Sequence, residues 1–290
     1  MLHGVIAYAC IDSLVLMVMA LGFNMTFGIS GVANFAYGAI YIMSAFLVWI
    51  FLNTLNLPYL ISGIISVCIA TLLGALMYRV ILLRVRGREL LEVITTFGLG
   101  MAILEIFPYL GFVGLKYTLP PFVQGEIEIF GTVIDYQRLI ILGVSVLLIG
   151  SFTLFTHFTK LGLAFRSIAQ DEKTSLTIGI DSDRIAMYSV ALGAGLAAIA
   201  ALLIIPLGNI TASQGFDVII NALAICIIGG IGSMGGIVVA SLVIGFIQTF
   251  TDYYIGSHWV MVVSLAAILV VLIIKPSGFF GKQKELQERV

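Results

Sequence analysis

The sequence predicts an all-α fold, a polytopic bundle of transmembrane helices that forms a single transmembrane domain over residues 1–290. Of the 290 residues, 61% are hydrophobic and only 10% are charged, whereas about one quarter of a soluble domain is usually charged. Charged residues are also absent from long blocks, at 13–78, 185–216, 218–251 and 253–274. Because ionised side chains are costly in hydrocarbon, such blocks indicate helices embedded in lipid.

Breaks in these apolar blocks define nine predicted helices. Glycines at 28–31 and a polar turn at 53–58 divide the first block into helices near 5–27, 32–53 and 59–83. A fourth helix is expected near 90–110, and the acidic, proline-containing stretch 111–138 is expected to be an aqueous loop. The remaining helices are expected near 139–157, 184–207, 217–231, 236–255 and 258–275. Since the segment 217–231 is short for a span, a count of eight is the alternative.

The basic residues predict the orientation of the bundle. Twelve of the fourteen lie in three clusters, near 79–88, 160–184 and 275–289. The positive-inside rule places such clusters on the cytoplasmic side. Clusters on the same side must be separated by an even number of membrane crossings. The nine predicted helices supply two crossings between the first and second clusters and four between the second and third. The N-terminus and the loop 111–138 are therefore expected outside, and the short tail 276–290 inside.

Several other classes of protein are not favoured. A net charge of −1 provides no basic surface for nucleic acid. The three cysteines lie in apolar runs without metal-ligand spacing, which is typical of buried small residues; they are Cys10, Cys68 and Cys226. The three histidines are far apart in the sequence. We find neither a nucleotide motif nor a nucleophile–base set, so we expect no metal, no cofactor and no enzymatic activity in this chain.

Isolated acids are another candidate for function, because an acid inside a membrane is rare. Asp12 lies about two turns into the first predicted helix, whereas Glu92, Glu105 and Asp252 lie near predicted helix ends, from which they can reach water. No arginine falls inside a predicted span to act as a counter-ion. A proton relay is therefore not the favoured interpretation.

The segment 158–184 is long and polar for a cytoplasmic turn. Leu161, Phe165 and Ile168 fall at helical spacing between charged residues, which predicts an amphipathic helix parallel to the membrane. Such a helix can insert its apolar ridge into the groove of a soluble partner, or it can simply lie on lipid.

Five residues of this segment are candidates for contact with a partner. Phe165 is a candidate anchor, and Arg166 can bind a carboxylate in bidentate fashion. Asp171 and Glu172 are expected to pair with a basic partner surface. Gly179 suits a sharp bend that returns the chain to the membrane.

Two glycine-rich stretches, Gly28–Gly38 and Gly229–Gly236, predict broken helices. They permit either close packing of helices through small residues or a bend beside a substrate path. The glycines concerned are Gly28, Gly31, Gly229, Gly230, Gly232, Gly235 and Gly236. Three asparagines in apolar surroundings, Asn24, Asn34 and Asn221, form either interhelical hydrogen bonds or part of the route of a polar solute.

Four motifs in order resemble the membrane permease subunit of branched-chain amino acid ABC transporters, over nearly the whole chain. They are Gly31-Val-Ala-Asn-Phe-Ala-Tyr-Gly38 with the small residues that follow, the loop from Leu161-Gly through Gln170-Asp-Glu to Gly179-Ile-Asp-Ser-Asp-Arg184, Ile228-Gly-Gly-Ile-Gly-Ser-Met-Gly-Gly236, and Pro276-Ser-Gly-Phe-Phe-Gly281. Tyr37 stands where the family commonly has a histidine.

The resemblance implies a multi-pass subunit of the cell inner membrane that translocates branched-chain or related amino acids. It also implies ABC ATPase subunits that bind the cytoplasmic segment, a second homologous permease, and an extracytoplasmic solute-binding protein. The expected partners are these proteins and membrane lipid. The alternatives are a permease for urea, amides or aromatic acids, and a secondary transporter or channel, which would more often carry embedded acids.

Overall fold

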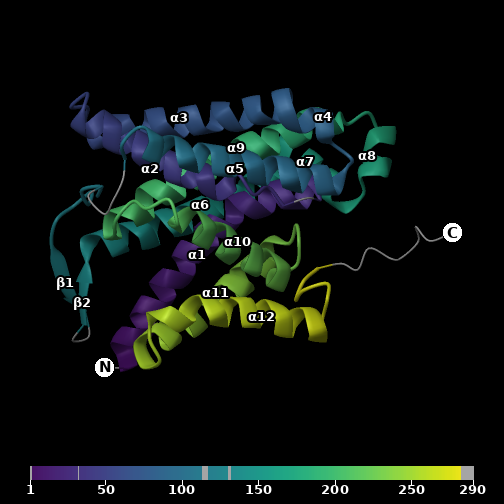
Figure 1. Ribbon diagram of the computed structural model, residues 1–290. Coiled ribbons are helices and arrows are strands. Elements are labelled where there is room, and N and C mark those ends of the chain that lie inside the picture. The colour runs from purple at the N-terminus through teal and green to yellow at the C-terminus, as the bar shows by residue number, and fades with distance from the viewer. Residues whose placement is uncertain (1, 32, 113–116, 130–131, 282–290) are drawn as a thin grey trace.

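The computed structural model describes residues 2–31, 33–112, 117–129 and 132–281, and it confirms the predicted all-α membrane bundle (Figure 1). The larger helices are α1 (Leu2–Ser30), α2 (Tyr37–Asn53), α3 (Tyr59–Met77), α5 (Glu89–Tyr109), α6 (Tyr136–Phe158), α9 (Ser182–Ile204), α10 (Gln214–Gly229), α11 (Met234–Tyr254) and α12 (Val260–Ile274). The shorter elements are the π-helical turn η1 (Tyr78–Leu82), α4 (Leu83–Val85), α7 (Lys160–Gln170), α8 (Glu172–Thr177) and the 3-10 turns η2 (Ile205–Leu207) and η3 (Ser257–Trp259).

The large helices coincide with the nine predicted segments. By length and composition, seven of the helices in the described ranges can cross a membrane. The other two, α2 and α10, have 17 and 16 residues. At 1.5 Å per residue α10 is about 24 Å long, which is shorter than a hydrocarbon core of about 30 Å. The choice between eight and nine spans therefore stays a prediction.

Small residues allow α1 and α9 to form the centre of the bundle. α1 packs against α9, α10 and α11, and α3 packs against α9. A Cβ atom added to Gly193 of α9 would lie 2.8 Å from the carbonyl oxygen of Gly22 in α1. Lipid is as apolar as leucine, so close van der Waals packing of this kind is what draws helices together in a membrane. α12 lies at the edge and exposes Leu269 and Ile273.

Both glycine-rich stretches break the helices as predicted. α1 ends at Ser30, Gly31 has a φ of +72°, and α2 begins at Tyr37. α10 ends at Gly229 and α11 begins at Met234, with Gly230 and Gly232 between them at φ angles of +97° and +77°. Positive φ angles are accessible to glycine at little cost, which explains the composition of these turns.

The two ends of the bundle carry different structures (Figure 1). At one end lies an antiparallel hairpin of β1 (Glu126–Ile129) and β2 (Thr132–Asp135), in which Ile127 pairs with Ile134. This hairpin is inside the stretch predicted to be an aqueous loop. At the opposite end lie α4, α7 and α8, so the basic clusters near 79–88 and 160–184 share one end, as the crossing count requires. Lys282, Lys284 and Arg289 of the third cluster lie outside the described residues.

Candidate functional site

The segment 160–183 folds as two short helices joined by capped turns. The Thr159 hydroxyl accepts a hydrogen bond of 3.0 Å from the backbone N–H of Gly162 at the start of α7. Asp171 accepts one of 3.2 Å from Thr174 N at the start of α8. Because such caps satisfy backbone donors that a helix end leaves unpaired, they define where each helix begins. Gly179, with a φ of +83°, forms the bend that leads back to α9.

Phe165 does not occupy the exposed position expected of an anchor. Its side chain is only 4% exposed, and its ring lies 5.9 Å from the ring of Phe155 at the end of α6. The reason is the glycine at 162: a Cβ atom there would lie 2.2 Å from the carbonyl oxygen of Phe155. α7 therefore packs directly on the end of α6, and the apolar ridge predicted for a partner is covered by the chain itself.

Other apolar side chains of the segment do face outward. The exposed fractions are 52% for Leu163 of α7 and 71% for Ile178 after α8. Leu161 and Leu176 are also exposed. These four exposed side chains are together called the α7–α8 surface here, and they replace Phe165 as the candidate partner contact.

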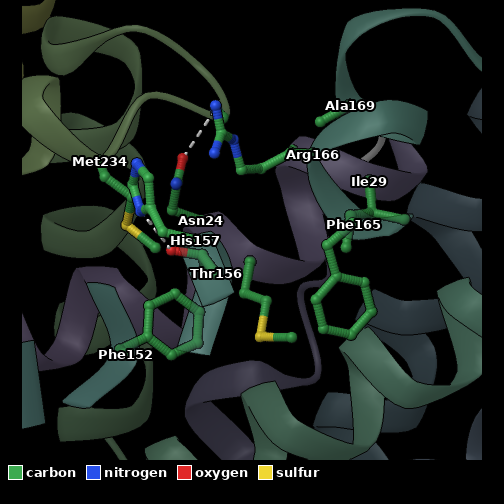
Figure 2. Close-up of a pocket in the computed structure, with 12 residues that line it drawn as sticks. Asn24, Ile29, Phe152, Thr156, His157, Phe165, Arg166, Ala169 and Met234 are labelled. Atoms are coloured by element: carbon green, nitrogen blue, oxygen red, sulfur yellow. Dashed lines mark hydrogen bonds between the residues drawn. The ribbon is translucent and has the colours of Figure 1, made fainter. Parts of the chain in front are cut away.

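Arg166 lies at the rim of a cavity of about 170 Å³ between α1, α6, α7 and the turn that precedes α11. Figure 2 shows its side chain extending toward Asn24, with the rings of Phe152 and Phe165 at the opposite wall. His157 adds a second polar group. The cavity is largely apolar, and Arg166 remains exposed for contact with a partner.

Asn24 lines this cavity, and its side-chain oxygen is bound to backbone, so a place in a solute route stays a prediction for it. It is 2% exposed, and its Oδ1 accepts a hydrogen bond of 2.9 Å from the N–H of Gly232. Gly28, one turn later, lies so close that its Cβ atom would be 2.8 Å from Cα of Gly232. The two glycine-rich stretches thus meet here, and Asn24 satisfies a donor that their close contact would otherwise leave without water.

Close packing also accounts for most of the other glycines. A Cβ atom on Gly236 would lie 2.0 Å from the carbonyl oxygen of Gly229, and one on Gly230 would lie 2.2 Å from the backbone nitrogen of Gly281. The chain after α12 is paired here, since Phe280 N–H donates a hydrogen bond of 3.0 Å to the Gly229 carbonyl. Gly235 differs, because space around it is open. The geometry favours the packing interpretation of this stretch over a bend beside a path.

Asn34 stabilises the turn between α1 and α2. It is 6% exposed, and its Oδ1 accepts a hydrogen bond of 3.1 Å from Ala36 N. It lines a small hollow of about 20 Å³ together with Thr26, Arg86 and Glu92. The hollow therefore lies between the helix break and the basic residue that binds the segment 160–183.

Arg86, which sequence reasoning treated only as part of a basic cluster, binds that segment directly. Its Nη2 lies 2.7 Å from Oε1 of Glu172, and its Nη1 bonds to Asp183 and, at 3.0 Å, to the hydroxyl of Tyr78. Partial burial disfavours the charge, but Tyr78 and the two carboxylates outweigh it, so the pKa of Arg86 is raised. No short motif reveals this pairing, because the partners are separated by about ninety residues.

The two acids expected to pair with a partner are engaged within the chain. Glu172 forms the ion pair with Arg86 and accepts a hydrogen bond from Ser182. Asp171 caps α8, and hydrogen bonds from Thr174 hold the pKa of Asp171 below its usual value. Both acids thus have partners within the chain, but both also remain exposed, so contact with a basic partner surface stays a prediction.

Asn221 is the third predicted asparagine, and it alone of the three is half-buried. Its Oδ1 accepts a hydrogen bond of 2.9 Å from Nε2 of Gln248 in α11, and Gln248 also bonds to Ser264 in α12. Sequence analysis did not single out Gln248. The available signal was a second amide side chain, besides Asn221, in the uncharged block 218–251.

An ion pair at the other end of the bundle was also missed. Arg138, in the first turn of α6, places Nη1 3.7 Å from Oδ1 of Asp12 and lies over the ring of Tyr8. Thr249 donates a hydrogen bond of 3.0 Å to Asp12. The expectation that Asp12 has no arginine counter-ion was wrong, because the long side chain of Arg138 reaches from the helix end across to α1.

Comparisons with known proteins identify relatives of this chain. The family described as the branched-chain amino acid transport system permease component matches residues 5–272. The high-affinity branched-chain amino acid transport permease BraD of Pseudomonas aeruginosa is 30% identical, with 91% of each chain covered. LivH of Escherichia coli, a permease protein of the same description, is 27% identical, with 91% of this chain and 90% of the relative covered.

A solved structure shares the fold. PsaBC from Streptococcus pneumoniae in complex with Fab superposes with a TM-score of 0.53 at 14% identity, covering 94% of this chain and 92% of the other. Seven helices in the described ranges are suited to spanning a membrane, and the chain is a multi-pass protein of the cell inner membrane. It belongs to the family of branched-chain amino acid transport system permease components.

Proposed function

We propose that this chain is the solute-conducting permease subunit of an ATP-driven importer, which translocates branched-chain or related amino acids delivered by an extracytoplasmic binding protein. The relatives are named as branched-chain amino acid permeases, which supports the substrate class. We expect the chain to act with a second homologous permease and with separate ABC ATPase subunits. ATP hydrolysis is assigned to those subunits.

The observation that carries the proposal is the α7–α8 surface at one end of the bundle. Exposed apolar side chains such as Leu163 and Ile178 lie on short helices that caps and the Arg86 ion pair fix to the membrane domain. Exposed apolar side chains that are held in fixed positions suit the groove of a soluble partner. A surface that only rested on lipid would need no ion pair to α4.

This assignment also fixes the proposed orientation. The α7–α8 surface and the neighbouring basic cluster face the cytoplasm, and the β1–β2 hairpin faces outward, toward the binding protein. The positive-inside rule supports this direction.

Reconstitution tests the proposal. Proteoliposomes that contain this chain, its second permease and its ATPase should take up leucine, isoleucine or valine only when binding protein and ATP are both present. An ATPase subunit without hydrolytic activity is the control and should abolish uptake. Uptake that continues with the inactive ATPase would instead identify a secondary transporter or channel.

A further inference from the structure

We propose that Asp217, Asn221 and Gln248 form a substrate-contacting strip, at which the permease binds the charged groups of an amino-acid zwitterion in transit. The inference rests on the proposed function and deepens it, because it names side chains that contact the solute and the chemical form of solute they accept.

Two residues of the strip lie on α10, which at 16 residues is shorter than the helices that can span a membrane, and the third lies on α11. Asp217 and Asn221 are four residues apart, so they share one face of the helix. Asp217 is exposed and Asn221 is half-buried. Asn221 is near the middle of α10 (Gln214–Gly229), about 12 Å from its C-terminal end at 1.5 Å per residue.

The beginning of α10 is packed within the bundle rather than raised above it. Gly215 lies against Gly38 of α2. A Cβ atom added to Gly38 would be only 1.9 Å from the Gly215 carbonyl oxygen. The first turn that contains Asp217 is therefore level with a buried part of α2, whose Ile40 and Ile42 are fully buried. Asp217 is thus an exposed carboxylate on the side of the bundle, level with the start of α2, and the proposal places it at membrane depth.

The hydrogen-bonding capacity of the strip is only partly used. Gln248 Nε2 donates to Asn221 Oδ1 and to Ser264. Within the described part of the chain, no hydrogen bond or ion pair engages Nδ2 of Asn221, Oε1 of Gln248 or the carboxylate of Asp217. Two acceptors and one donor therefore remain for a ligand.

Hydrocarbon cannot satisfy these groups, because an ionised or unpaired polar side chain at membrane depth faces protein or water. The proposed second permease would enclose this face and leave a polar route between the subunits. An exposed apolar side chain, such as that of Leu72 on α3, can face lipid because it needs no hydrogen-bonding partner.

The free groups match a zwitterion rather than an anion. The ammonium group of an amino acid can donate to the Asp217 carboxylate and to Oε1 of Gln248, while its carboxylate accepts from Nδ2 of Asn221. A deaminated acid, such as the corresponding 2-oxo acid, would bring a second negative charge against Asp217 without a compensating donor. The strip therefore selects amino acids against anionic analogues.

Access from water tests the location of the strip. With the native cysteines replaced, Asp217→Cys and Asn221→Cys should react with a charged, membrane-impermeant thiol reagent in the assembled complex, and leucine delivered during turnover should slow the reaction. Leu72→Cys, on a lipid-facing position, is the matched control and should not react. Absence of reaction at both strip positions would overturn the proposal.

Uptake tests the chemistry. In proteoliposomes with saturating leucine-loaded binding protein, Asp217→Asn should lower uptake at least about tenfold, the usual scale for loss of a charged hydrogen bond. Glu105→Gln removes another exposed carboxylate, on α5, and should leave uptake unchanged. Docking of the ATPase, measured by pull-down, should be normal in both variants.

The failures of the two proposals are distinguishable. If the unmodified complex shows no ATP-dependent uptake, the proposed function is wrong. If it transports leucine, but Asp217→Asn and Asn221→Ala transport it equally well, only the substrate-contacting strip is rejected.

Discussion

The guanidinium of Arg86 and the carboxylate of Glu172 lie 2.7 Å apart and join the end of α4 to the start of α8. The same arginine contacts Tyr78 of the π-helical turn and lines a small hollow with Asn34. A single side chain thus binds the proposed ATPase-binding segment and lies beside the helix break between α1 and α2. π-helical turns often occur at functional sites.

Loss of this connection should affect coupling more than stability. Arg86→Gln should lower solute transported per ATP hydrolysed, because α8 would no longer be fixed to α4. The ion pair is partly exposed, with 48% of the Glu172 side chain accessible, so its loss should cost no more than about 1 kcal/mol of stability. Arg84→Gln, at an exposed neighbouring position, is the control. Unchanged coupling in Arg86→Gln would refute this role.

The α7–α8 surface should be the main determinant of ATPase binding. Ile178→Glu or Leu163→Glu would place a charge on an exposed apolar contact and should weaken pull-down of the ATPase by at least about tenfold, a typical effect at an interface anchor. Folding should be unaffected, since both side chains are exposed. Val133→Glu, at an exposed position of the β1–β2 hairpin at the other end of the bundle, is the control and should bind the ATPase normally. Normal binding by both variants would contradict the docking proposal.

Phe165→Ala should act through stability. The ring is buried against Phe155, and removing a buried phenylalanine costs about 3–5 kcal/mol. Thermal unfolding of the purified chain in detergent, followed by intrinsic fluorescence, should show a lowered midpoint. A wild-type midpoint together with loss of ATPase binding would restore Phe165 as a direct partner contact.

The glycine turn provides a matched pair of substitutions. Gly236→Ala would bring a methyl group to 2.0 Å from a backbone oxygen, so backbone must move, whereas Gly235→Ala meets nothing within 4 Å. The first should lower stability by about 1–3 kcal/mol or more, and the second should be nearly neutral. The yield of monodisperse protein and its unfolding midpoint provide the measurement. Equal behaviour of the two variants would contradict the packing role.

Labelling can test the orientation of the chain in whole cells. After replacement of the native cysteines, Val133→Cys in the β1–β2 hairpin should react with an impermeant reagent applied from outside, since Val133 is exposed. Ile178→Cys should react only after the membrane is opened. The reverse pattern would invert the proposed topology.

Local patterns were sufficient for the helices and their breaks. A helix satisfies its own backbone and lipid excludes charge, so uncharged runs between glycine-rich stretches locate the helices almost independently of one another. The breaks at Gly31 and Gly230 follow from the conformational freedom of single residues. The Gly179 bend was anticipated on the same ground.

Contacts between distant segments required the tertiary structure. The helical spacing of Phe165 predicted an apolar ridge but could not tell whether a partner or the end of α6 covers it, and the structure shows α6. The pairing of Arg86 with Glu172 and of Arg138 with Asp12 depends on how helices remote in sequence lie side by side. Periodicity describes one element at a time, whereas the partner of a charged side chain is decided by the packing of several.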